Sequence, residues 1–259
     1  MSQPRERTKH SRSGRADIDR SLIGLTVAGL AALTVLARSD LGLSAPAGSV
    51  TLAGWLAYAL VVRSAAIRAG LTWFGWANRV TALRGLLVAL TIPFLLAPDA
   101  GGWLPTALGA AALALDGVDG ALARRSGAAS PFGARCDMET DALTVLMLSA
   151  LVAAQGQVGP WVLASGALRY LYVGAGWIWP PLRRPPPPSF ARKLVCVLQI
   201  AGLLVALSPI LPPPWPSVVA GVSLALLLWS FGRDTWGLLR DKGMAESSAA
   251  PYLSDTGGV

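Results

Sequence analysis

Long apolar runs without charged residues alternate with short polar segments through most of this 259-residue chain. A helix needs about 20 apolar residues to cross a bilayer, and the longer runs reach that length. The runs cover residues 21–37, 41–62, 85–98, 100–115, 142–179 and 194–232, and Arg169 is the one charged residue within them. With 53% of its residues hydrophobic, the chain is predicted to be an all-α integral membrane protein.

The two longest runs each contain a polar or proline-rich interruption, at Gln155–Pro160 and at Ser208–Pro216. Such interruptions are typical of short loops between antiparallel spans. Dividing the runs there gives eight expected spans. They lie at roughly 21–38, 48–63, 79–98, 103–124, 135–154, 160–179, 192–210 and 215–232.

The basic residues between the spans predict the orientation of the chain. Every second loop contains Lys or Arg, and the loops between them contain neither. Because cytoplasmic loops carry the excess of basic residues, we expect a multi-pass plasma-membrane protein with both termini in the cytoplasm. A cleaved signal peptide at the first apolar run is the alternative, although the polar segment before that run is long for one.

The first 20 residues hold six of the 22 basic residues and no aromatic residue. This composition predicts a disordered cytoplasmic tail that contacts anionic lipid and fixes topology, with no nucleic-acid partner. Residues 21–76 are expected to form two N-terminal transmembrane helices. The other six expected spans follow, and residues 233–259 are expected to form a cytoplasmic C-terminal tail.

Histidine and cysteine chemistry are improbable in this chain. The single histidine, His10, lies in the basic tail, and the two cysteines, Cys136 and Cys196, have no metal-binding spacing. A histidine general base and a histidine-ligated zinc site are therefore not expected. Any chemistry must depend on carboxylates.

Five of the 14 acidic residues lie within 26 residues, between two apolar runs. Asp116 and Asp119 are three apart at the inner end of the fourth expected span, and Asp137 and Asp141 are four apart at the inner start of the fifth. Spacings of three and four place side chains on one helix face. Two antiparallel helices would let the pairs face each other, with Glu139 as an additional acid.

Four facing carboxylates near a membrane repel one another and require protons or cations. Ligands that are all oxygen suit Mg²⁺, Mn²⁺ or Ca²⁺, and two such ions can hold a phosphoryl group. Helix caps, solvated charges and a proton relay are the alternatives. The spacing of the whole set favours a site for two divalent ions, with Mg²⁺ or Mn²⁺ expected.

The same residues resemble the signature of the CDP-alcohol phosphatidyltransferases, D-x2-D-G-x2-A-R-x8-G-x3-D-x3-D. Every fixed position is filled: Asp116, Asp119, Gly120, Ala123, Arg124, Gly133, Asp137 and Asp141. The segments Ala77–Leu87 and Arg192–Gln199 also resemble the family's N-x2-T-x2-R and K-x5-Q patterns. The resemblance covers about residues 77–232, so the two N-terminal spans precede the family's six-helix core.

The resemblance implies transfer of a phosphoalcohol group from a CDP-linked lipid, such as CDP-diacylglycerol, to a small hydroxyl acceptor with release of CMP. It implies that Asp116, Asp119, Asp137 and Asp141 bind two divalent ions, and that Asp141 also acts as the base. Thr81, Gly120, Arg124 and Ser130 resemble positions that bind the CDP-alcohol. For Thr81 and Arg84, a helix start and an interfacial anchor are equally good interpretations. A homodimer is expected from the family alone.

The acceptor is not readable from the sequence. Family members that use phosphorylated acceptors commonly have Lys or Arg after the last Asp, where this chain has Ala142. Arg169 lies in mid-span and is a candidate to bind an acceptor phosphate or to neutralise Glu139. Arg192 and Lys193 are further candidates for acceptor binding.

Two other classes of function remain as alternatives. A cation or proton transporter would use the acidic cluster but predicts acids or broken helices at the middle of several spans. A catalytically idle membrane scaffold would be expected to lose a motif acid, and none is lost here.

Overall fold

The computed structural model describes residues 4–39, 41, 44–100, 102–126, 130–179 and 190–249. Within these ranges the chain forms helices and no strand. The helices are α1 (Pro4–Arg38), α2 (Ala45–Arg68), α3 (Trp76–Ala89), α4 (Pro93–Leu96), α5 (Leu104–Ser126), α6 (Pro131–Ala154), the 3-10 turn η1 (Pro160–Val162), α7 (Leu163–Ile178), α8 (Phe190–Leu207) and α9 (Trp215–Ala249).

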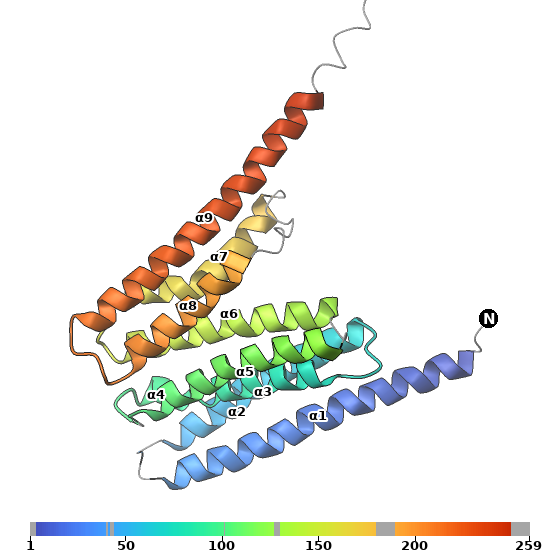
Figure 1. The fold of residues 1–259 in the computed structure, drawn as a ribbon. Coiled ribbons are helices and arrows are strands. Elements are labelled where there is room, and N and C mark those ends of the chain that lie inside the picture. Colours follow the sequence, from blue (N-terminus) through green and yellow to red (C-terminus); the bar gives the residue numbers. More distant parts are fainter. Residues whose placement is uncertain are drawn as a thin grey trace, which may run out of the picture.

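The helices run back and forth as an elongated bundle (Figure 1). α3 packs most extensively against α5, and α8 against α9. α6 is central, because it contacts α3, α7 and α8. α1 begins at the end of the bundle where α5 ends and α6 begins, which is the end that holds the acidic segment (Figure 1).

Two clusters of buried apolar side chains hold the described helices together. One joins α4, α6, η1, α8 and α9, around Leu148, Leu151 and Leu203. The other joins α1 and α2 to α3, around Ile18, Trp55 and Leu86. The two N-terminal helices are therefore packed onto the rest of the protein mainly through α3, and α2 also contacts α4 and α6.

Four helical segments are long and apolar enough to cross a membrane, by length and composition: Gly14–Arg38, Pro46–Arg68, Trp76–Leu96 and Trp215–Arg233. The protein is thus an all-α membrane protein, as the apolar runs predicted. Helices also occupy the other four expected positions. The crossing of the membrane by α5, α6, α7 and α8 remains a prediction; in α6, Asp137, Glu139 and Asp141 shorten the apolar stretch.

The helix boundaries differ from the sequence expectation in three places. Residues 4–20, expected to be disordered, are helical and continuous with the first span. The expected span 79–98 is divided into α3 and α4 by a turn before Pro93, which has no N–H to continue a helix. The last helix continues past residue 232 to Ala249.

Candidate metal and active site

The acidic residues of α5 and α6 meet between these two helices, in the half of the bundle nearer to where α5 ends and α6 begins. Asp116 of α5 and Asp137 and Asp141 of α6 place carboxylate oxygens within 4.8 Å of one another. Asp137 and Asp141 share one face of α6 because they are four residues apart. The sequence prediction that these acids would assemble across two antiparallel helices is therefore matched by the described side chains.

A third helix contributes a cation to this cluster. Nη1 of Arg84 on α3 lies 3.2 Å from Oδ1 of Asp116 and 2.5 Å from Oδ1 of Asp137. Its Nη2 donates to Oδ1 of Asp141. The Arg84 side chain is only 1% exposed. With all acids ionised, one buried guanidinium and three carboxylates leave two negative charges, which a further cation can balance.

The donor set fits a divalent ion. All candidate ligands are carboxylate oxygens, which Mg²⁺ and Mn²⁺ prefer. Two opposite ligands of an octahedral Mg²⁺ are separated by about 4 Å, so oxygens within 4.8 Å are close to ligand spacing. Arg84 contacts the same oxygens, and an ion would share the carboxylates with it.

The start of α6 lies beside the start of α3. Ser130 caps α6, where its Oγ accepts from the backbone N–H of Gly133 at 3.0 Å. A Cβ on Gly133 would lie 3.0 Å from Oδ1 of Asn78, so the two helices approach closely there. Thr81 is buried one turn after Asn78, and its Oγ1 donates to the carbonyl of Ala77 at 3.1 Å. The nucleotide-binding roles expected for Ser130 and Thr81 remain predictions.

Arg169 of α7 forms an ion pair with Glu139 of α6, at 2.6 Å between Nη2 and Oε1. Of the two roles considered for Arg169, the structure contains the neutralisation of Glu139. Arg192 and Lys193 lie in the first turn of α8, half-buried and exposed respectively.

Three expected site residues lie on α5 beyond the described side chains. These are Asp119, Gly120 and Arg124. All three positions are helical, as the motif spacing predicted.

Sequence reasoning gave Arg84 no specific partner. An Arg near the start of a membrane helix is ordinarily an interfacial anchor, but here it is buried among the acids. Cys196 of α8 was interpreted as a small apolar residue, and its Sγ lies 4.0 Å from Oδ2 of Asp141. Cys196 lies within the K-x5-Q pattern between Lys193 and Gln199, and this position was the one sequence feature that could have placed it near the site.

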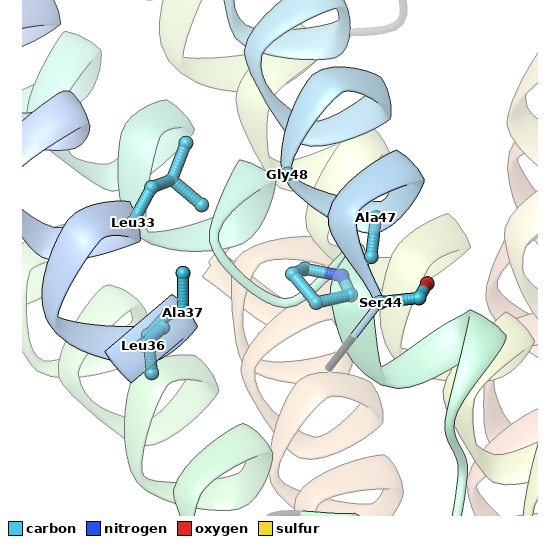
Figure 2. Close-up of a pocket in the computed structure, with 7 residues that line it drawn as sticks. Leu33, Leu36, Ala37, Ser44, Ala47 and Gly48 are labelled. Atoms are coloured by element: carbon cyan, nitrogen blue, oxygen red, sulfur yellow. The ribbon is translucent and has the colours of Figure 1, made fainter. Parts of the chain in front are cut away.

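A small cavity of about 210 Å³ (Figure 2) lies at the end of the bundle opposite to where α5 ends and α6 begins (Figure 1). It is formed where α1 ends and α2 begins, with Pro93 of α4 at its side. Its lining consists of Leu33, Leu36, Ala37, Ser44, Ala47, Gly48 and Pro93. No carboxylate lines it, so it is not the chemical site.

A helical membrane protein with an oxygen-ligand site between its helices is the class that this fold and site define. Residues 74–230 match the model of the CDP-alcohol phosphatidyltransferase family, and the chain belongs to that family. The match begins just before α3 and ends within α9, and α1 and α2 precede it. No curated protein and no solved structure matches the chain.

Proposed function

We propose that this enzyme transfers a phosphatidyl group from CDP-diacylglycerol to the hydroxyl of a small acceptor and releases CMP, in phospholipid synthesis. Transfer from a CDP-alcohol follows from the family. The diacylglycerol donor, the acceptor, the plasma membrane and the cytoplasmic orientation of the site are our proposals. One observation supports the proposal above all: three carboxylates from two helices lie within 4.8 Å of one another beside a buried arginine.

Asp141 is the residue we assign as general base. Its Oδ1 accepts from Arg84, whereas its Oδ2 lies on the side of Cys196 in α8. An acceptor hydroxyl between α6 and α8 would transfer its proton to Oδ2 as its oxygen attacks the lipid-side phosphorus. The new O–P bond replaces the bond to the CMP phosphate, and CMP leaves.

Arg84 acts in this scheme by holding Asp141 in place through a charge-assisted hydrogen bond. Divalent ions bound by Asp116, Asp137 and Asp141 would neutralise the donor pyrophosphate and make the phosphorus easier to attack. We assign Asp119 to the second ion, and Thr81, Gly120, Arg124 and Ser130 to the CDP-alcohol.

The acceptor contacts are assigned by position. Because Arg169 is engaged by Glu139, we propose that it shapes the acceptor side of the site without binding a phosphate. Arg192 and Lys193, at the start of α8, remain our candidates for contacting the acceptor. A homodimer also remains a proposal.

Release of CMP by the purified full chain in detergent tests this function. The assay contains CDP-diacylglycerol, Mg²⁺ or Mn²⁺, and one acceptor at a time: glycerol 3-phosphate, inositol phosphate, inositol, serine or none. We expect metal-dependent CMP release with one acceptor. Asp141→Asn should lower the rate by about 10²- to 10⁴-fold, the usual contribution of a general base.

Asp99→Asn is the matched control, because Asp99 is exposed in the loop between α4 and α5. It should retain the wild-type rate. Tight metal-dependent CDP binding without turnover would contradict the proposed donor or acceptor. Absence of both turnover and nucleotide binding would contradict the transferase function and favour a membrane scaffold.

A further inference from the structure

Tyr58 of α2 fits into a gap on α3 that exists because residue 85 is glycine. A Cβ on Gly85 would lie 2.4 Å from both Cε1 and Cζ of the Tyr58 ring and 2.8 Å from its hydroxyl. These separations are far below van der Waals contact, so no larger residue fits at position 85 with the ring in place. The ring therefore packs directly on the α3 backbone beside Arg84.

The hydroxyl of Tyr58 joins α3 to α6. It lies 2.9 Å from Oγ1 of Thr140 and 3.4 Å from the carbonyl oxygen of Thr81. The Thr140 hydroxyl donates to the carbonyl of Cys136 at 2.8 Å, so the single Tyr58 hydroxyl proton is shared between Oγ1 of Thr140 and the more distant carbonyl of Thr81. A single phenol thus connects the backbone of α3 to a side chain of α6.

Both ends of this connection are next to the acid cluster in sequence. Thr140 precedes Asp141, and Gly85 follows Arg84. Arg84 joins α3 to α6 at the same level, through its contacts with Asp137 and Asp141. The contacts of Tyr58 and those of Arg84 therefore lie next to each other between α3 and α6.

Tyr58 is itself held by the N-terminal helices. Trp55 is buried one turn earlier on α2, with its ring centroid 5.7 Å from that of Tyr58. The Nε1 of Trp55 donates to Oγ1 of Thr26 on α1 at 2.9 Å. α1 and α2 lie outside residues 74–230, the part that matches the family.

We propose that Tyr58 is a positioning residue for the acid site, supplied by a helix outside the catalytic core. It holds α3 against α6, and so it keeps Arg84 among the carboxylates that also bind the divalent ion. The proposal rests on the proposed function where turnover is measured. Metal affinity is a second measurement, which does not depend on turnover.

A specific signature follows from the shared carboxylates. The guanidinium and a divalent cation repel each other and compete for the same oxygens. Removing the Tyr58 hydroxyl lets Arg84 withdraw, so the metal should bind more tightly. Turnover should become slower, because Arg84 then orients Asp141 less well. Simple destabilisation would instead weaken both.

The test compares Tyr58→Phe with wild type, using full-length protein in detergent. Loss of free Mn²⁺ signal in electron paramagnetic resonance gives the affinity, and CMP release gives the rate. We expect about 2- to 10-fold tighter Mn²⁺ binding, the range for loss of one hydrogen bond, with a lower kcat. Tyr172→Phe is the matched control, because Tyr172 packs on Phe231 of α9. It should change neither value.

A size exchange provides the second test. Gly85→Ala should displace the ring and lower kcat further than Tyr58→Phe. Tyr58→Leu lacks the ring atoms that the added methyl would meet. The double variant Gly85→Ala/Tyr58→Leu should therefore match Tyr58→Leu, without the additional loss caused by Gly85→Ala alone.

Unchanged or weaker Mn²⁺ binding in Tyr58→Phe would overturn the proposal. Additive effects in the double variant would also overturn it, since they would show that the two residues do not interact. The proposed function can fail separately. In that case the wild type releases no CMP, while Tyr58→Phe still binds Mn²⁺ more tightly.

Discussion

Arg84 is the residue on which the acid site most depends for stability without metal. Its side chain is buried and contacts Asp116, Asp137 and Asp141. Removing one partner from a buried ionic cluster costs about 3–5 kcal/mol, because the remaining charges lack compensation. A divalent cation can supply that compensation.

We therefore predict that Arg84→Met lowers the melting temperature strongly in EDTA. Saturating Mg²⁺ or Mn²⁺ should restore a larger share of stability to this variant than it adds to wild type. Thermal unfolding in detergent with and without metal measures both. Arg63→Met is the control, because Arg63 pairs with Asp19 at the α1–α2 surface. An equal response to metal in Arg84→Met and wild type would contradict the prediction.

The acids of the site were predictable from local spacing, whereas their neighbours were not. Three- and four-residue intervals place Asp137 and Asp141 on one helix face whatever surrounds them. Tyr58 reaches Thr140 across 82 positions of sequence. The hydrophobic pattern of the sequence does not predict such a contact, because it depends on how α2 packs against α3 and α6. Gly85, the residue that makes room for the ring, was visible only as a small residue in an apolar run.

α1 is the element that departs most from its expected form. A polar, basic segment was expected to be disordered, because it cannot bury apolar surface by itself. In the structure Gly14 approaches the backbone closely, since a Cβ there would lie 2.5 Å from the carbonyl oxygen of Leu71. Ile18 is fully buried. Contact with the segment before α3 therefore supplies the order that the composition lacks.

Asp17 ties α1 to the start of α3. Its carboxylate accepts from the backbone N–H of Phe74 at 2.9 Å and from Nη2 of Arg79 at 2.8 Å. Asp17→Asn should weaken these charge-assisted hydrogen bonds, each worth about 1.5–3 kcal/mol. We predict faster hydrogen–deuterium exchange in peptides that cover residues 71–79.

Asp19→Asn is the control for this experiment. Asp19 lies two residues after Asp17 on α1 and pairs with Arg63 of α2 at 2.6 Å, so it does not contact α3 through this ion pair. Exchange in residues 71–79 should remain at the wild-type rate. Equal exchange in both variants would show that Asp17 does not hold the start of α3.

At the scale of the whole molecule, eight helices were expected as spans, and helices occupy all eight positions. The third expected span, 79–98, is divided at Pro93. Pro93 lies within an uncharged apolar run, so hydropathy does not indicate this division. The family match over residues 74–230 agrees with the resemblance seen in the sequence, which covered about residues 77–232. The placement of α1 and α2 against α3 could not be predicted, because the motif says nothing about residues before the core.

The orientation of the whole protein remains a prediction from its loops. After replacement of Cys136 and Cys196, a single cysteine can be introduced at exposed positions on either side. In intact cells we predict that Gln157→Cys reacts with a membrane-impermeant maleimide, whereas Arg68→Cys does not react until the membrane is opened. Both positions are exposed. The reverse pattern would place the acid site outside the cell.

The contact between Asp17 and Phe74 also has a consequence for how the protein is made. The two residues are 57 positions apart, which at 5–20 residues per second corresponds to roughly 3–11 s of synthesis. Because synthesis proceeds from the N-terminus, α1 and α2 leave the ribosome before α3 does. We therefore expect the N-terminal hairpin to be the surface onto which α3 docks. On this order, residues 74–230 would assemble on two helices that lie outside the family match.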